Sequence, residues 1–520
     1  MFRIMPAYSV LLFLVSTVLG VSVDDSWQNG PVSHQQQMLR DCLVTKAVPT
    51  ILNSSSEWTS FTTAYNLRLQ YTPIAVALPT TPQHVSDAVT CAAETGVKVQ
   101  PRSGGHSYGS YSLGGKNGSL VVDLQKFNSI SLDRSSGIAT VGGGVRLGNL
   151  GVELFNQGQR ALPHGTFPGV GIGGHYTHGG FGYSSRRWGL ALDTILAMDV
   201  VLADGRYIHV SSTRYPDIYY ALRGAADSFG IITTFYLRTQ PAPSEVVSFS
   251  ANFSSALDSA DRAADIVLRL QEFALSSSHM DRNITLEIYM NVFGQFIVRG
   301  WYFGDRNHFV KAVFPEMLEG TPKPENSTIQ SRAWLDALED IAEGEPLIEP
   351  LSGYDNHQTF YSKSVVTREA KPLTRNALES FFSFVIDKGL SMTDPWNTFI
   401  SLYGGKDSQI NKPSPHSAAY SHRDSLWVFQ NIGSSPNFLP PFSPNITAFV
   451  NDLNTALTSA QPDGDFLAYP NYLDPELTAA EAARLYYGST TYNRLVDIKH
   501  TVDPNATFWN PQAIGNVAFI

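Results

Sequence analysis

The sequence predicts an α+β protein, and three observations support this fold class. The chain has 520 residues, which predicts two or three structural units with large cores. Its first part alternates strand and helix patterns, as α/β units do. Its middle part shows a long amphipathic helix followed by alternating strands, which is typical of helices packed on an antiparallel sheet.

The strand–helix–strand order begins near residue 73. Residues 73–78 predict a strand, and a helical pattern starts at Thr81 with Pro82 in its first turn. The pattern ends at Gly96, and residues 97–101 predict the next strand. This β-α-β order leads directly into a Gly-rich turn.

Two Gly-rich stretches, residues 102–109 and 165–182, interrupt this first part. Strands are predicted after the second stretch, over 195–202 and 230–236, and a Pro-Ala-Pro sequence at 241–243 marks a boundary. Glycines let backbone N–H groups approach a pyrophosphate closely. We therefore expect the two loops to hold one dinucleotide between them.

The run Gly169-Val-Gly-Ile-Gly-Gly174 superficially resembles a nicotinamide-dinucleotide fingerprint. Such a site needs an apolar strand directly before the glycines and a helix directly after them. Here the residues 164–168, His-Gly-Thr-Phe-Pro, precede the run and more glycines follow it, which argues against a Rossmann domain. His175 and His178 lie nearby, but no carboxylate or cysteine accompanies them at ligand spacing, so we expect no metal site.

The middle of the chain changes character. Residues 256–274 predict an amphipathic helix, residues 284–291 alternate as a strand, and residues 295–303 pair with that strand. One face of the first strand carries Ile284, Leu286, Ile288 and Met290, and the other carries Thr285, Glu287, Tyr289 and Asn291. Near the end, residues 478–481 form a capping box before another helix.

The composition is that of a globular protein, with 43% hydrophobic and 16% charged residues. This balance argues against disorder. The net charge is -10 and the chain has no dense run of Lys and Arg. This charge pattern argues against a nucleic-acid partner, because phosphate binding needs a basic face.

The first 22 residues have the pattern of a secretory signal peptide. Arg3 supplies the positive start, residues 8–20 are mostly apolar, and residues 20–22 are suited to cleavage. A membrane anchor needs roughly 20 apolar residues, and this run is shorter. We expect the protein to be secreted or to lie in the lumen of the secretory pathway, without a membrane anchor.

Seven N-x-Ser/Thr sequons and only two cysteines agree with export. In an oxidising compartment we expect Cys42 and Cys91 to form a disulfide, and the alternative is two buried thiols. The predicted glycosylation sites are Asn53, Asn117, Asn252, Asn283, Asn326, Asn445 and Asn505.

Tyr469 and Tyr472 lie in an irregular segment around Pro470. A tyrosine hydroxyl accepts a substrate proton only if its surroundings lower its pKa, which is about 10 when unperturbed. Taken from the residues alone, a structural role is the alternative interpretation for both side chains.

The first Gly-rich stretch, Arg102-Ser-Gly-Gly-His-Ser-Tyr108, resembles the flavin-attachment motif of FAD-linked oxidases with the vanillyl-alcohol-oxidase fold. More narrowly, the chain resembles fungal oligosaccharide oxidases and berberine-bridge-enzyme-like proteins over nearly its whole length. Further motifs in the same order carry the resemblance: Gly-Val-Gly-Ile-Gly-Gly-His175, His-Gly-Gly-Phe-Gly182, Val-Leu-Ala-Asp-Gly205, Leu-Arg-Gly224, Ser-Phe-Gly-Ile231, Tyr-Tyr-Gly488 and Asp-Pro504.

The resemblance implies a PCMH-type FAD-binding domain, built as two α/β subdomains from residues 40–245 and completed by a berberine-bridge-like segment, 465–520. Residues 246–464 would form an α+β substrate domain with an antiparallel sheet. The enzyme would be an FAD-dependent oxidase or dehydrogenase.

The resemblance also implies that His106 carries FAD covalently, through the 8α carbon of the flavin. Tyr472 matches the catalytic base, which takes a hydroxyl proton while a hydride passes to flavin N5, and Tyr469 is its neighbour. Oxygen would be the electron acceptor. The further implied FAD contacts are Arg102, Ser103, Gly104, Gly105, Ser107, Tyr108, Pro168, Gly169, Gly171, Gly174, His175, Gly179, Gly180 and Ile231.

Two departures from the family pattern bear on function. Oligosaccharide oxidases usually attach the flavin a second time through a cysteine, where this chain has Phe167, so we expect a single attachment. They also carry Gln and Asp where this chain has Phe399 and Ser401. The missing Asp is the group expected to help Tyr472 act as a base.

The expected substrate contacts are Phe399 and Ser401, together with Thr166, Glu287 and Gln430, which match the family. Phe399 makes the pocket more apolar, and unpaired sugar hydroxyls there would cost about 1–3 kcal/mol each. The sequence therefore favours oxidation of an alcohol-type carbon in a small organic molecule, such as a secondary-metabolite intermediate. The alternative is a carbohydrate oxidase or dehydrogenase that converts a lactol to a lactone.

Overall fold

The computed structural model describes residues 33–351 and 357–520, so the expected signal peptide lies outside the described residues. The predicted strand–helix–strand order forms a small sheet in which β2 (Ala75–Ala77), β4 (Leu120–Asp123) and β3 (Val99–Arg102) are parallel. β1 (Thr50–Ile51) pairs antiparallel with β2. The connecting helix α4 (Pro82–Thr95) begins at the Thr81 cap and ends at Gly96, whose φ of 69° is unstrained in glycine.

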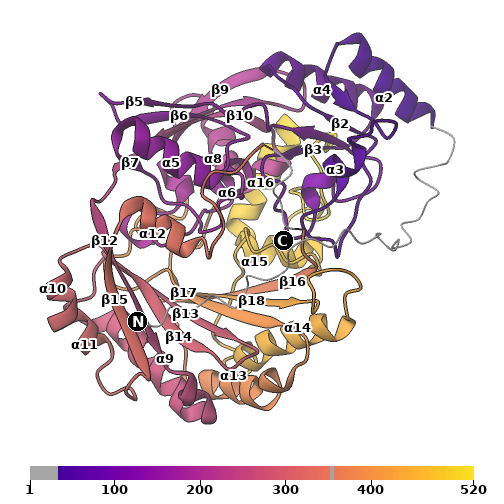
Figure 1. Ribbon diagram of the computed structural model, residues 1–520. Coiled ribbons are helices and arrows are strands. Elements are labelled where there is room, and N and C mark those ends of the chain that lie inside the picture. Colours follow the sequence, from indigo (N-terminus) through magenta and orange to yellow (C-terminus); the bar gives the residue numbers. More distant parts are fainter. Residues whose placement is uncertain (1–32, 352–356) are drawn as a thin grey trace.

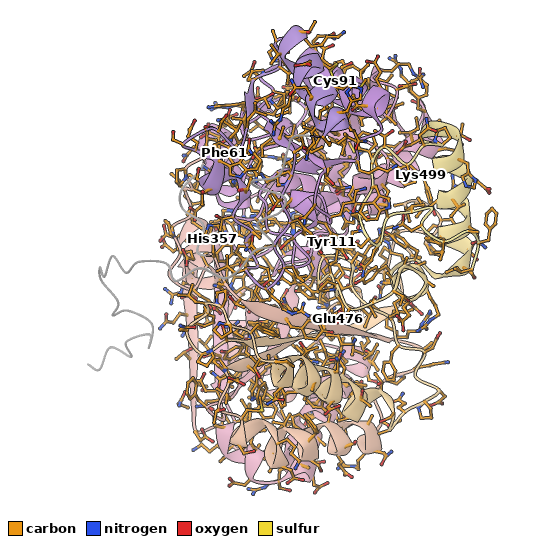
Figure 2. The ribbon with its side chains drawn as sticks, turned by 90° about the vertical axis from the view of Figure 1, so that its right-hand side faces the viewer. Phe61, Cys91, Tyr111, His357, Glu476 and Lys499 are labelled. Carbon is orange, nitrogen blue, oxygen red and sulfur yellow. A yellow bond between two sulfur atoms is a disulfide. The ribbon has the colours of Figure 1, made fainter. Side chains whose placement is uncertain are left out.

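The helix α2 (His34–Thr45) packs against α4. Cys42 and Cys91 join the two helices in a disulfide with a Cα–Cα distance of 5.7 Å, as predicted. Figure 2 shows Cys91 at one end of the molecule, far from Glu476.

A second sheet has the order β5-β6-β10-β8-β9 and is antiparallel throughout. Its strands are β5 (Ile130–Asp133), β6 (Ile138–Gly142), β8 (Ile195–Val201), β9 (Tyr207–Ser211) and β10 (Ile231–Arg238). The core beside it also contains α5 (Leu147–Gly158), α6 (Ile172–Thr177), α8 (Pro216–Ala225), α15 (Ala479–Tyr486) and α16 (Gly488–Val502). The C-terminal helices thus pack with elements from the first half of the chain (Figure 1).

The middle of the chain forms a seven-stranded antiparallel sheet of order β15-β12-β14-β13-β17-β18-β16. Its strands are β12 (Glu245–Asn252), β13 (Ile284–Asn291), β14 (Phe296–Tyr302), β15 (Asn326–Ala333), β16 (Phe360–Arg368), β17 (Trp396–Leu402) and β18 (Ser425–Ser434). Three helices cover one face: α9 (Ala260–Ser276), α13 (Arg375–Asp387) and α14 (Pro444–Thr458). In Figure 1 these helices lie on the side of the sheet away from the N-terminal half.

The predicted alternation of β13 is confirmed. Ile284, Leu286, Ile288 and Met290 are fully buried in the core under the three helices. Glu287 points to the opposite face, where it pairs across the sheet with Arg299 on one side and Ser401 on the other. The period-two pattern therefore places the polar residues of β13 toward the Gly-rich loops.

The predicted helix over 256–274 begins later than expected. A 3₁₀ turn, η4 (Ser254–Asp258), comes first, and Ser259 is extended at the start of α9. The apolar spacing continues through both pieces, so periodicity alone does not reveal the break.

The remaining elements are short: β7 (Arg160–Ala161) paired with β11 (Gln240–Pro241), α3 (Trp58–Thr62), α7 (Ser185–Trp188), α10 (Arg306–His308), η5 (Phe309–Val313), α11 (Phe314–Met317), α12 (Trp334–Ile341), η1 (Tyr111–Leu113), η2 (Ala191–Thr194), η3 (Ala226–Ser228) and η6 (Gly389–Ser391). Within 33–351 and 357–520, no helix is long and apolar enough to cross a membrane.

Arg186 in α7 joins the N-terminal half to the seven-stranded sheet. Its buried guanidinium donates to the carbonyl oxygens of Gly404 (3.0 Å), Asp281 (2.9 Å), Lys406 (3.0 Å) and Ile284. Burial lowers the pKa of Arg186 to about 9, which leaves it charged at neutral pH.

Candidate active site

A cavity of about 1310 Å³ lies between the two Gly-rich loops and the exposed face of the seven-stranded sheet. Many of the residues expected at the site line this cavity. These are Ser103, Gly104, Gly105, His106, Ser107, Tyr108, Thr166, Gly171, Gly174, His175, Glu287, Phe399, Gln430, Tyr469 and Tyr472.

The two Gly-rich loops touch each other at Gly104 and Gly171. A Cβ on Gly104 would lie 2.1 Å from the backbone nitrogen of Gly171, so no side chain fits there. The Ser103 hydroxyl accepts the N–H of Gly173 (3.1 Å) and donates to the carbonyl of Gly143 (2.7 Å). The result is a backbone cradle of the kind that can approach a pyrophosphate.

His106 lies at this cradle between two aromatic rings. Its ring centroid is 4.1 Å from that of Tyr65 and 5.3 Å from that of Phe167. Phe167 therefore faces His106 from the second loop, at the position where the resemblance has its cysteine. Tyr65 also lines the cavity, but no motif in the sequence marked it.

Several expected FAD contacts lie behind the cavity wall. Arg102 pairs with Asp123 at 2.6 Å, and Ile231 is fully buried in its strand. Gly179 and Gly180 have φ angles of 126° and 82° and wrap around the ring of Tyr469. Pro168 and Gly169 likewise lie outside the lining set of the described residues.

A polar group of side chains, which includes His178 and Asp227, also lines the cavity. His178 and Asp227 form an ion pair at 3.3 Å, and Asn510 from the C-terminal segment donates to the other carboxylate oxygen at 2.8 Å. Burial lowers the pKa of His178, but the bonds to Asp227 outweigh burial and raise it overall. His175 differs, because burial lowers its pKa to about 3 and its Nε2 accepts the Gly165 N–H at 2.8 Å.

Tyr469 and Tyr472 lie edge to face, with ring centroids 4.9 Å apart. The ring of Tyr472 is also parallel to that of Tyr108 at 6.4 Å, and Gln430 donates to the Tyr108 hydroxyl at 2.9 Å. Burial raises the pKa of all three tyrosines.

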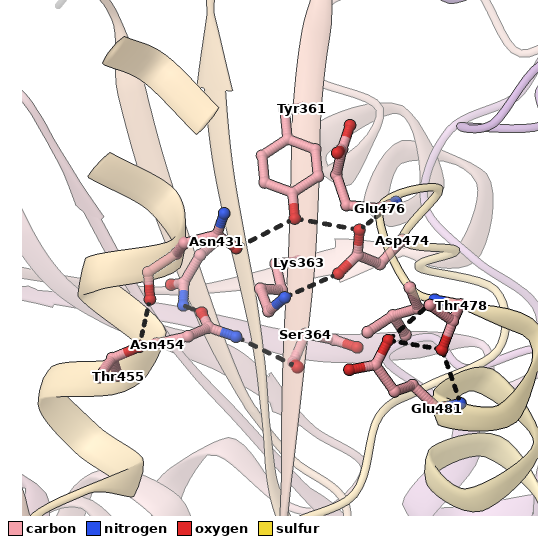
Figure 3. A network of polar contacts seen from close by, with 12 residues as sticks. Tyr361, Lys363, Ser364, Asn431, Asn454, Thr455, Asp474, Glu476, Thr478 and Glu481 are labelled. Atoms are coloured by element: carbon pink, nitrogen blue, oxygen red, sulfur yellow. Dashed lines mark hydrogen bonds and ion pairs between the residues drawn. The ribbon is translucent and has the colours of Figure 1, made fainter. Parts of the chain in front are cut away.

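The segment that carries the two tyrosines is anchored to β16. Asp474 accepts hydrogen bonds from Tyr361 (3.0 Å) and Lys363 (2.9 Å), as Figure 3 shows. Ser364 of the same strand accepts the backbone N–H of Tyr469 at 2.9 Å. The sheet thereby fixes where the tyrosines stand.

Glu287 is the charged centre of the sheet face and is only 8% exposed. Its carboxylate accepts hydrogen bonds from Tyr183 (3.0 Å), Arg299 (2.9 Å) and Ser401 (2.9 Å). Glu287 therefore does not lie on a solvated strand face, which is where a polar strand residue is usually found. Arg299 was not singled out from the sequence, although the pairing of 284–291 with 295–303 places it opposite Glu287.

Phe399 and Ser401 lie on the same face of β17, as the alternation predicted, but only Phe399 lines the cavity. Phe399 lines the cavity, 5.2 Å from the ring of Tyr289 and 5.7 Å below the Arg299 guanidinium. Ser401 is 4% exposed and lies behind Glu287 rather than on the cavity wall.

The cavity continues from Glu287 toward the edge of the sheet. Ser250 and Thr328 face each other there across β12 and β15, with hydroxyl oxygens 2.9 Å apart. Ser248, Gln330 and Arg332 line the same polar extension.

Comparison with known proteins agrees with this geometry. The family described as FAD binding domain matches residues 73–211, and the family described as berberine and berberine like matches residues 468–515. The xylooligosaccharide oxidase of Thermothelomyces thermophilus is 37% identical over 91% of this chain and 93% of its own length. This chain belongs to the FAD-linked oxidase family.

Two further relatives show the range of the FAD-linked oxidase family. The FAD-linked oxidoreductase dpmaF of Metarhizium anisopliae is 33% identical, over 94% of this chain and 93% of its own. A structure of glucooligosaccharide oxidase from Acremonium strictum, whose FAD is described as 6-S-cysteinyl and 8α-N1-histidyl, has a TM-score of 0.86 at 30% identity, covering 93% of this chain and 100% of that one. The protein is thus an FAD-dependent oxidoreductase with the PCMH-type fold.

The residues present fit FAD. The Gly104–Gly171 contact forms a cradle without side chains, and the cavity wall beside it contains a histidine at the attachment position of the motif. The cavity is also large enough for a dinucleotide and a substrate.

Proposed function

We propose that this oxidoreductase oxidises the lactol carbon of a carbohydrate to a lactone. The observation that carries the proposal is the polar extension of the cavity, along Ser248, Ser250, Thr328 and Gln330. Hydroxyl and amide groups in a row can pair with the hydroxyls of successive sugar units, which an apolar wall would leave unpaired at about 1–3 kcal/mol each. The xylooligosaccharide oxidase relative supports the same substrate class.

In this proposal the residues of the chain divide the work. His106 anchors FAD, and the loop backbones at Gly104 and Gly171 approach its pyrophosphate. Tyr472 receives the proton of the substrate hydroxyl, and Glu287 and Gln430 orient the sugar. Bound FAD supplies the two-electron acceptor for the hydride, and oxygen is the final acceptor that we propose.

We propose a single covalent attachment of the flavin, because Phe167 stands where the resemblance has a cysteine. Phe167 offers a ring, not a thiol, 5.3 Å from the His106 ring. Carbon–sulfur bonding is impossible at this side chain.

A second candidate function is oxidation of a small, less polar alcohol, such as a secondary-metabolite intermediate. One observation favours it: Phe399 presents an aromatic ring in the cavity wall. However, that ring also packs against Tyr289 and Arg299, so part of its apolar surface is already covered.

Anaerobic reduction separates the two candidates. The purified holoenzyme is mixed with cello-, xylo- or chito-oligosaccharides while flavin bleaching is followed. Rapid bleaching by one series is expected, and its absence with every sugar would favour the second candidate. Repeating the reaction in air with a peroxide assay tests oxygen as the acceptor.

The polar extension can be tested by itself. The double change Ser250→Ala and Thr328→Val removes two hydroxyls from the wall with little change in shape. We expect KM to rise about thirtyfold for a tetrasaccharide, because two hydrogen bonds of about 1 kcal/mol each are lost, and to stay constant for a disaccharide. Thr213→Val, at an exposed turn, is the matched control. Equal KM changes for both sugars would contradict the groove assignment.

We propose an FAD domain of residues 40–245 and 465–520 around a substrate domain of 246–464, in a secreted glycoprotein. The Cys42–Cys91 disulfide supports export. Among the sequons, Asn53, Asn117, Asn326, Asn445 and Asn505 are exposed, whereas Asn283 is half-buried with its amide nitrogen donating to Asp281 at 2.9 Å.

A further inference from the structure

A row of polar side chains crosses the seven-stranded sheet from Glu287 to Thr328. Glu287 of β13 is directly opposite Arg299 of β14. Ser250 of β12 is directly opposite both Arg299 and Thr328 of β15. Residues opposite each other point to the same face of a sheet, so all four face the cavity that they line. Adjacent strands are about 4.8 Å apart, so the row is about 14 Å long, enough for a few sugar units.

Asn326 lies just beyond the outer end of this row. It is two residues before Thr328 in β15, so its side chain points to the same face of the sheet, about 7 Å farther along the strand. β15 is the edge strand of the sheet, and Asn326 is exposed. Its side chain is therefore open to solvent on the cavity side of the edge.

Asn326 is also the first residue of the sequon Asn326-Ser-Thr328. An N-linked glycan is bulky and stays on the protein surface. Attached to the side-chain nitrogen of Asn326, it would begin on the cavity face of the edge strand. It would then occupy the space into which a sugar chain continues when it extends past Thr328.

Two other sequons on this domain differ from Asn326. Asn252 lies opposite Asn326 on β12, but it is half-buried and its Oδ1 accepts the N–H (2.9 Å) and the hydroxyl (2.6 Å) of Ser254. Asn445 is exposed in the first turn of α14, which packs on the opposite face of the sheet. A glycan on Asn445 is separated from the cavity by the whole sheet, which makes this residue a matched control.

We propose that an N-linked glycan on Asn326 closes the outer end of the polar extension and limits the length of the sugar chain that the enzyme accepts. The inference rests on the carbohydrate oxidation and on the secreted glycoprotein proposed above. In that function Glu287 orients the sugar unit that is oxidised, so further units extend along the row toward Thr328. Short oligosaccharides fit within the row, whereas longer ones meet the glycan.

The first measurement needs no substrate. The secreted holoenzyme, produced in a eukaryotic host, is digested, and mass spectrometry of its glycopeptides shows which asparagines carry glycans. We expect a glycan on Asn326 in most molecules and none at this position in Asn326→Gln. An unmodified Asn326 would overturn the proposal, whatever the enzyme oxidises.

The second measurement follows anaerobic flavin reduction with one series of oligosaccharides, from disaccharide to hexasaccharide. The readout is the sugar concentration that gives half of the maximal rate. For the hexasaccharide we expect it to fall about fivefold in Asn326→Gln, the effect of one regained hydrogen bond. For the disaccharide it should stay constant, and Asn445→Gln should match wild type at every length.

The outcomes of this series separate the two proposals. Sugars that reduce the flavin with the same dependence on chain length in wild type and Asn326→Gln would contradict the role of the glycan and leave the proposed function intact. No reduction by any sugar would contradict both. A weaker response of Asn326→Gln to the tetrasaccharide would mean that the glycan assists binding, which is the opposite of the proposal.

Enzymatic trimming of the wild-type glycans separates the glycan from the amino-acid change. An endoglycosidase that shortens each glycan to its first sugar should give the hexasaccharide response of Asn326→Gln without any substitution. The trimmed Asn445→Gln protein should respond in the same way, because its remaining glycans include the one on Asn326. An unchanged hexasaccharide response after complete trimming would rule out the steric role.

Discussion

At the scale of single residues, Ser401, which stands where the family has Asp, holds the carboxylate of its cross-strand neighbour Glu287. Ser401 donates to Glu287, which also accepts from Arg299 and Tyr183. The carboxylate on this part of the sheet face belongs to Glu287 of β13. Ser401 holds it in place, and an Asp there would have to face Glu287 directly.

Restoring the family residue at this position should therefore harm this protein. In Ser401→Asp two carboxylates would compete within hydrogen-bond distance, which raises the pKa of one of them. A carboxyl with a raised folded-state pKa binds its proton more tightly in the native state. We expect the stability of the variant to fall as the pH rises from about 4 toward neutral, measured as Tm against pH.

Ser401→Asn is the control for that experiment, since it has the shape of Asp without the charge. Its Tm should follow the wild-type pH dependence. Parallel curves for the Asp and Asn variants would mean that the positive charge of Arg299 compensates for both carboxylates.

Tyr472→Phe tests the proton transfer itself. Loss of a general base typically costs about 10²–10⁴-fold, and we expect a loss of that size in the rate of anaerobic flavin reduction. Sugar affinity, measured as the substrate dependence of that rate, should change little. An unchanged reduction rate would remove Tyr472 from the mechanism.

At the scale of elements, the Gly-rich loops and the sheet differ in how far the sequence predicts them. The first loop and the outward face of β13 follow from glycine spacing and period-two alternation. The hydrogen bonds that the backbone N–H groups of Gly180 and Phe181 donate to the Tyr469 hydroxyl do not, because this loop lies about 290 residues from Tyr469 and its glycine φ angles are left open by the sequence. Tyr65 beside His106 is of the same kind. Local patterns predict faces and turns; contacts between distant segments require the fold.

The attachment loop yields a direct prediction. His106→Ala should release the flavin when the protein is denatured, because Phe167 cannot replace the lost bond. The measurement is the flavin content of the supernatant and of the precipitated protein. Flavin retained on the denatured variant would point to another attachment residue.

A cysteine at position 167 in the second Gly-rich loop would test whether this loop can form a covalent bond to the flavin. In Phe167→Cys the thiol would lie on the side of His106 where the ring now packs. The glucooligosaccharide oxidase with 6-S-cysteinyl FAD shows that this fold supports such a bond. We expect flavin to remain attached in the Phe167→Cys, His106→Ala double variant, with Phe167→Ser as the control that cannot bond.

At the scale of the whole molecule, the site exists only where the two halves meet. The cradle and His106 belong to the N-terminal half, Glu287 and Gln430 belong to the seven-stranded sheet, and the tyrosines come from the returning C-terminal segment. Lys499 on the returning helix is buried against the N-terminal half, where Figure 2 shows it, and is paired with Asp503 at 2.7 Å. Any loosening of the junction therefore changes the distance between cofactor and substrate groups.

Arg186 provides the sharpest test of that junction. Arg186→Met keeps the unbranched stem of the side chain but leaves four buried carbonyl oxygens without their donor, at about 1–3 kcal/mol for each that stays unsatisfied. We expect a large fall in Tm and, at temperatures where the variant is folded, slower flavin reduction, because the sheet carrying Glu287 is no longer tied to the cradle. Arg206→Met, which breaks an exposed pair with Asp204, should change stability by no more than about 0.5 kcal/mol. If the Arg186 variant lost stability but reduced its flavin at the wild-type rate, the junction would support the fold without positioning the site.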